Sequence, residues 1–243
     1  AEHDLGKYYP KDADGSTPIA YLWARTIISE APDDGTGIPV EVPLLRSMWL
    51  AKKAKKPSAL RWMRNKSGEI QTELVEKAFA NGQSITIRRP LLEIFEPEKH
   101  NEVESGTVAR GAATCPITGY TTPVASVRKQ LKLRKGGAND ARLFAVVLTK
   151  PDQQGRFYRL PCEVDFQAVQ AATRELNSRI STHHSSLSLV PNESTKDYES
   201  FVNRGPIYGL LNWDDYYTSR QLLVLSGFIS LIQKINLSEL KPE

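Results

Sequence analysis

The chain has little cysteine and no long apolar run. Its 243 residues include only two cysteines, Cys115 and Cys162, so a disulfide framework is excluded and a four-ligand zinc site is not expected. The longest apolar stretch, residues 222–235, is broken by Ser226, Gly227 and Lys234 and is too short and too polar to span a bilayer. Nothing at the N-terminus resembles a signal peptide. We therefore expect a protein of the reducing cytoplasm.

The usual signatures of a self-contained active site are also missing. No Gly-rich phosphate loop stands between a strand and a helix, and no Ser-His-Asp set can be assembled. His183 and His184 stand beside serines, without the carboxylate or thiolate neighbours that a metal site needs. The sequence therefore predicts no catalytic, cofactor-binding or metal-ligating residue in this chain. The chain starts at Ala1 without a methionine, which fits a trimmed product or a piece of something longer.

Positive charge is clustered, although the net charge is only +4. The first basic block comprises Lys52, Lys53, Lys55, Lys56, Arg61 and Arg64, and the second comprises Arg128, Lys129, Lys132, Arg134 and Lys135. Either block could neutralise phosphates, which releases counterions and strengthens nucleic-acid binding, or could be a solvated loop. Trp62, between Arg61 and Arg64, is the aromatic residue that could stack on a base. Trp23, Trp49 and Trp213 are interpreted as core residues.

Short strands joined by turns dominate the first two thirds of the chain. Asn81-Gly82 indicates a hairpin, although residues 73–80 could also form a helix. A second hairpin is expected where the strand at 143–149 meets residues 156–160 across Pro151–Gly155. The stretch 43–50 is a further strand candidate. We expect an α+β fold of ribbon-like antiparallel hairpins with two or three helices and irregular connections.

Two helices carry clear start signals. Asp165 can cap a helix whose inward face is formed by Phe166, Val169, Ala172, Leu176 and Ile180. Thr218 and Gln221 form a capping box for a helix with Leu222, Leu225, Phe228, Ile229 and Ile232 inward. The predicted organisation is a β-rich unit over residues 1–162 and a helical unit over residues 163–243.

The string Cys115-Pro116-Ile117-Thr118-Gly119 is similar to a zinc knuckle whose second thiol is now threonine. Three further strings accompany it in order: residues 17–26 (TPIAYLWART), residues 42–50 (VPLLRSMWL), and Tyr208-Gly209 followed by residues 213–215 (WDD) and 220–223 (RQLL). The knuckle itself ends a string over residues 106–116 (GTVARGAATCP). Together they resemble adenine-specific DNA methylases that carry a zinc-ribbon insertion, in register over about residues 8–235.

This resemblance implies a degenerate ribbon and chemistry that is carried elsewhere. The family's first Cys pair is missing from residues 27–40, and the second is halved, so packing must replace the metal. The family flips an adenine out of the duplex and methylates its amine with S-adenosylmethionine, using a cofactor loop expected upstream and an Asp-Pro-Pro-Tyr motif expected downstream. The chain contains no Pro-Pro pair. The resemblance thus implies a central region that binds double-stranded DNA and supports the remaining methylase segments or a partner chain.

Other functions stay open at this stage. The chain could be a protein-interaction or scaffold module with a decayed ribbon, or an independent enzyme with an unrecognised site. The pathway, whether restriction-modification, phage defence or regulation, is not encoded in any motif of the sequence.

Overall fold

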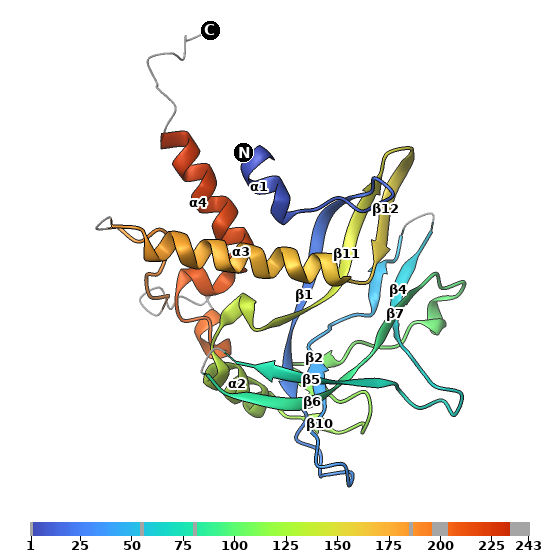
Figure 1. Cartoon of the computed structure of the whole chain (residues 1–243). Coiled ribbons are helices and arrows are strands. Elements are labelled where there is room, and N and C mark those ends of the chain that lie inside the picture. The colour runs from blue at the N-terminus through green and yellow to red at the C-terminus, as the bar shows by residue number, and fades with distance from the viewer. Residues whose placement is uncertain (1, 54–55, 80–81, 185–186, 196–203, 234–243) are drawn as a thin grey trace.

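The computed structural model has an α+β fold built from antiparallel hairpins, as the sequence predicts (Figure 1). It describes residues 2–53, 56–79, 82–184, 187–195 and 204–233. The strands are β1 Thr17–Ile28, β2 Glu41–Pro43, β3 Trp49–Ala51, β4 Ser58–Trp62, β5 Thr72–Ala78, β6 Ser84–Pro90, β7 Leu92–Phe95, β8 Val108–Ala109, β9 Ala112–Thr114, β10 Thr121–Thr122, β11 Ala141–Lys150 and β12 Gln153–Arg159. The α-helices are α1 Glu2–Leu5, α2 Val124–Arg134, α3 Glu163–Ser181 and α4 Ser219–Gln233. The short 3-10 turns are η1 Gly6–Tyr8, η2 His100–Glu102, η3 Gly137–Asn139, η5 Gly205–Tyr208 and η6 Trp213–Tyr216.

The largest sheet has the strand order β12-β11-β1-β2. Thr17 of β1 pairs with Thr149 of β11, and Arg25 pairs with Ala141, so two strands far apart in sequence form its centre. Val146, Val147 and Leu148 of β11 are buried, which agrees with the apolar run that predicted this strand. The expected hairpin of β11 with β12 is confirmed.

Three smaller sheets have the orders β10-β9-β8, β3-β4-β7 and β5-β6. The β5–β6 hairpin confirms the turn predicted at Asn81-Gly82, although Asn81 lies outside the described residues and only Gly82 is placed. The prediction of a single strand over residues 43–50 was wrong. Leu45 receives a hydrogen bond on its carbonyl from Val108, and its amide donates to Thr107 Oγ1, so the chain bends between β2 and β3.

Both predicted helices are present. The capping box of α4 is confirmed, whereas the cap of α3 is a different residue from the one predicted. At α4, Thr218 N donates to Gln221 Oε1 at 2.9 Å, and Gln221 N donates back to Thr218 Oγ1 at 3.4 Å. At α3 the cap residue is Cys162 and not Asp165. Asp165 instead accepts from the Cys162 backbone N–H at 2.8 Å, as the third residue of the helix.

The inward faces of these helices differ from the prediction. In α3, Asp165, Ala168, Ala172 and Leu176 are buried, whereas Phe166 and Ile180 are exposed. In α4, the buried side chains are Arg220, Leu222, Leu223 and Ser226, whereas Leu225, Phe228, Ile229 and Ile232 are exposed. The buried face of α4 runs through the small residues Ser226 and Gly227, and a Cβ at Gly227 would lie in ordinary contact with Leu5, at 3.4 Å. The apolar periodicity of α4 therefore does not identify its buried face.

One core cluster joins the two ends of the chain. Leu5 and Tyr8 pack with Ala172 and Leu176 of α3 and with Leu222 and Leu223 of α4, and Figure 1 shows α1 beside these helices. The cluster takes residues from both predicted units, 1–162 and 163–243. The division into two units stays a prediction. Across the described residues, no helix is both long enough and apolar enough to cross a bilayer.

Candidate nucleic-acid interface

The first basic block lies on the β3–β4 hairpin and the loop that follows it. Lys52, Lys53 and Lys56 are exposed around the turn, and Lys55 falls outside the described residues. Lys52 lies 6.0 Å from the centre of the Trp49 ring. The exposed lysines remain available to a phosphate.

The two arginines of this block already have partners within the chain. Arg61 donates to Glu93 at 2.7 Å, and its guanidinium lies 4.7 Å from the centre of the Phe95 ring. Arg64 donates to Glu104 at 3.0 Å and to the Gly68 carbonyl at 2.9 Å. These surface pairs are weak and screened by salt, so a phosphate could compete for them, but at the cost of an existing contact.

Trp62 is not available for stacking on a base. Its side chain is only 4% exposed and packs in a cluster with Met48, Leu60 and Leu92. Neighbouring residues of a strand point to opposite faces of the sheet, so exposed Arg61 does not imply an exposed Trp62. The tryptophans interpreted as core differ too, because Trp213 is 36% exposed and Trp23 and Trp49 are half-buried.

Four residues of the second basic block, Arg128, Lys129, Lys132 and Arg134, lie on α2, a helix that the sequence did not predict, and Lys135 follows as its C-cap. Lys129, Lys132 and Lys135 are exposed at three-residue intervals; these three residues are called the α2 lysine stripe below. Arg128 is half-buried, with its guanidinium 5.5 Å from the centre of the Tyr208 ring. The α2 lysine stripe is therefore the part of this block that a phosphate can reach.

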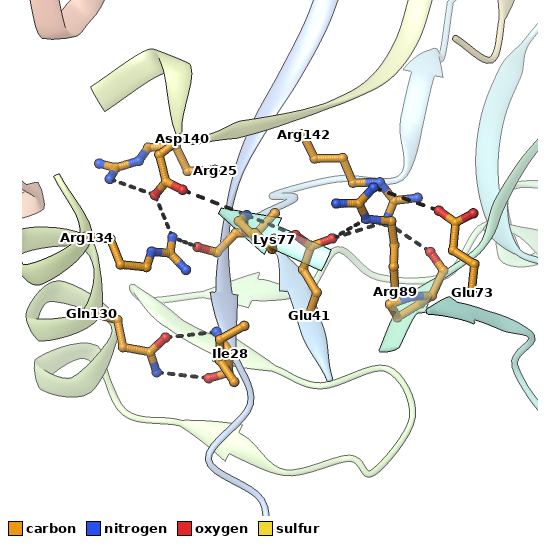
Figure 2. Close-up of polar contacts among 12 residues, drawn as sticks. Arg25, Ile28, Glu41, Glu73, Lys77, Arg89, Gln130, Arg134, Asp140 and Arg142 are labelled. Atoms are coloured by element: carbon orange, nitrogen blue, oxygen red, sulfur yellow. Dashed lines mark hydrogen bonds and ion pairs between the residues drawn. The ribbon is translucent and has the colours of Figure 1, made fainter. Parts of the chain in front are cut away.

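Polar side chains fix the opposite side of α2 to β1. The Ile28 amide donates to Gln130 Oε1 at 2.8 Å, and Gln130 Nε2 donates back to the Ile28 carbonyl at 2.9 Å (Figure 2). Arg134 is buried, donates to the Thr26 carbonyl and binds Asp140 at 2.7 Å. Arg134 thus serves as an anchor of α2, which corrects its assignment as a phosphate ligand.

A chain of buried ion pairs continues from this anchor (Figure 2). Glu41 is fully buried and accepts from Lys77 Nζ at 3.0 Å and from Arg89 Nε at 2.8 Å. Burial alone would raise the pKa of Glu41, but Lys77 and Arg89 outweigh it and lower the pKa to about 2. Lys77 also lies 3.8 Å from Asp140. The network therefore ties the β5–β6 hairpin to β2 and to the end of α2.

The two basic blocks do not form one patch. Figure 1 shows α2 at the lower left and β4 on the right, with the β5–β6 hairpin reaching between them. Because Arg134 and Trp62 are buried, the remaining candidates are exposed Lys52, Lys53, Lys56, Arg61 and Arg64 at one end, and exposed Lys129, Lys132 and Lys135 with half-buried Arg128 at the other.

The broken knuckle keeps a tight turn. The Gly119 amide donates to the Cys115 carbonyl at 2.9 Å, and the Cys115 amide donates to the Tyr120 carbonyl at 2.8 Å, which closes the β9–β10 hairpin. Cys115 is buried in a cluster with Ile27, Val40 and Val127. Within the part of the chain that the structure describes, no three His, Cys, Asp or Glu side chains are grouped so that they could hold a metal ion.

The loop between β1 and β2 lies against this turn. Thr118 lines the same pocket, of about 250 Å³, as Asp33, Asp34 and Ile38 of that loop. The residues at which the family resemblance expects the first Cys pair thus lie beside those of the second pair. Apolar contacts between Ile27, Val40 and Cys115 occupy the space behind them.

Comparison with known proteins adds no relative. No family model matches the chain, and neither a curated protein nor a solved structure does so.

Proposed function

We propose that this chain is the central, non-catalytic region of a DNA adenine-N6 methylase, acting in the cytoplasm. In this proposal it contacts double-stranded DNA and supports the segments that bind S-adenosylmethionine and the adenine. The observation that carries the proposal is the meeting of the β1–β2 loop with the Cys115–Gly119 turn, which share a pocket lined by Thr118. Two turns from distant parts of the chain, brought together over one small cluster, are the arrangement that a zinc ribbon needs.

The α2 lysine stripe is the surface proposed to meet DNA. Its lysines are exposed, and the helix that carries them is fixed from behind by Gln130 and Arg134. A rigid row of ammonium groups can neutralise successive phosphates without first losing an internal ion pair. Each phosphate neutralised contributes about 0.9 to the slope of log K against log salt.

The test compares two variants with the same change of charge. Lys129→Gln with Lys132→Gln removes two members of the α2 lysine stripe, and Lys11→Gln with Lys99→Gln removes two exposed lysines elsewhere. In duplex binding measured at several salt concentrations, we expect the first pair to lower the slope by about two. The second pair should leave the slope nearly unchanged. Equal effects of the two pairs would contradict a specific role for α2.

The proposal also predicts that residues 1–243 alone do not methylate DNA. Transfer of a labelled methyl group from S-adenosylmethionine to duplex by the purified chain would contradict it.

A second candidate function is a protein-interaction module that binds through α4. The exposed residues Leu225, Phe228, Ile229 and Ile232 are spaced to form one apolar face of that helix. If the Lys129→Gln, Lys132→Gln variant binds duplex as tightly as the unaltered chain at every salt concentration, this alternative gains.

A further inference from the structure

A cavity of about 400 Å³ lies between α3 and the strands β1 and β11. Its walls are mostly apolar and aromatic, with Trp23, Phe144, Phe166 and Val169 among them. A volume of this size and a lining of this kind are typical of sites for small organic molecules. The cavity is separate from the basic blocks discussed above.

Arg142 supplies positive charge at one end of this cavity. Its side chain is only 12% exposed, and Nη1 donates to the Pro90 carbonyl at 3.0 Å. The carboxylate within ion-pair range is Glu41, at 3.9 Å, which is too long for a hydrogen bond. A guanidinium has five N–H donors, so most of the hydrogen-bonding capacity of Arg142 is not used by a carboxylate.

Glu41 is already committed to other cations. Its oxygens accept from Lys77 at 3.0 Å and from Arg89 at 2.8 Å, and Figure 2 shows the guanidinium groups of Arg89 and Arg142 side by side. Burial, together with the charge of Arg89 and only partly opposed by Glu41 and Glu73, lowers the pKa of Arg142 to about 10. Glu41 therefore compensates Arg142 less closely than it compensates Lys77 and Arg89.

We propose that the cavity binds a planar aromatic anion, with its carboxylate on Arg142 and its ring against Phe144 and Phe166. The carboxylate would supply the acceptor that Glu41 is too far away to provide. The rings would bury the flat body of the ligand and favour offset or edge-on contact. This inference does not depend on the proposed function.

Glu73 gives the proposal a variant that should gain affinity. It lines the same cavity, is 49% exposed, and has its carboxylate 3.8 Å from Arg89 Nη1. A bound anion would be repelled by this carboxylate. Removing its charge should therefore strengthen binding, which an unfolded or damaged protein could not imitate.

The probe pair is 2-naphthoate and 2-naphthamide, which share a ring system and differ in charge. We expect calorimetric titration at neutral pH to show 2-naphthoate binding about tenfold more tightly, because one hydrogen bond to a charged group is of that size. Phe166→Ala, at an exposed wall residue, should weaken both probes. Equal affinity of the two probes, or binding of neither at millimolar concentration, would overturn the proposal.

Three variants then separate charge from packing. Glu73→Gln should tighten 2-naphthoate several-fold and leave 2-naphthamide unchanged, and Arg142→Gln should abolish the preference for the acid. Arg88→Gln is the control, since Arg88 pairs with Asp34 at 2.6 Å and does not line this cavity. If Arg142→Gln fails to fold, the Glu73→Gln variant alone tests the proposal. An affinity for 2-naphthoate that does not increase in Glu73→Gln would then contradict it.

Discussion

Replacing Glu41 with glutamine should destabilise the fold more than any other single change in the ion-pair network. Glu41 is fully buried and is shared by Lys77 and Arg89, with Arg142 further away. A glutamine of similar shape keeps one acceptor oxygen but removes the charge. Lys77 and Arg89 would then lose the carboxylate that they share, and the carboxylate left beside Lys77 would be Asp140, at 3.8 Å.

The magnitude follows from the pKa of Glu41. Lowering it from 4.5 to about 2 corresponds to about 3 kcal/mol of stabilisation of the charged form. Removing one partner of a buried ion pair costs roughly 3–5 kcal/mol in other proteins. We therefore expect Glu41→Gln to lower the free energy of unfolding by about 3 kcal/mol or more.

Urea titration at pH 7, followed by circular dichroism, measures this loss. A second variant, Lys77→Met, and the double variant complete a cycle, and the double variant should recover part of the loss because no buried ammonium remains unpaired. A loss below about 1 kcal/mol for Glu41→Gln, or strict additivity of the two changes, would refute the argument that the buried pair is coupled.

Other predictions test the pH dependence, the turns and the knuckle. Because the folded pKa of Glu41 lies below its usual 4.5, its contribution should be complete above that pH and lost as the pH falls toward 2; acid titration of Glu41→Gln should lack this step. Gly137→Ala should cost about 3 kcal/mol or more in urea titration, because its φ is +51° and the new Cβ would lie 2.1 Å from the Asp215 carbonyl oxygen. Gln221→Ala should lower stability by about 1 kcal/mol through loss of the α4 cap, and an unchanged melting temperature would contradict this. A chelator should not change the melting temperature, since Cys115 is packed among apolar side chains.

Strands and capped helices could be predicted because their signals are local. The apolar run of β11 and the Thr218 capping box each lie within a few residues, and the structure confirms both. Helix α2 was missed for the opposite reason. Two of its main anchors, Gln130 and Arg134, are polar and bind backbone groups of β1 about a hundred residues away, and no apolar periodicity reports such contacts.

The residues of the candidate interface could be predicted from the sequence only in part, for a related reason. Charge clustering located Lys129 and Lys132, which are exposed, but could not separate them from buried Arg134. Arg134 is distinguished by Asp140, six residues further along the chain, and by the carbonyl of Thr26, which is distant in sequence and becomes its neighbour only in the folded chain. The cavity lined by Arg142 is likewise formed by residues of β1, β5, β11 and α3. No single segment of the sequence could therefore predict it.

The order in which this chain leaves the ribosome has a consequence for how it can fold. The pairing of β1 with β11 cannot form until β11, more than a hundred residues later in the chain, has been synthesised. The guanidinium of Arg220 donates to the Tyr8 carbonyl at 3.1 Å, across a separation of 212 residues, so Tyr8 can make this contact only after α4 has been synthesised. Contacts between residues so far apart in sequence slow folding. During synthesis, the N-terminal half would have to be protected from aggregation until α4 has been made.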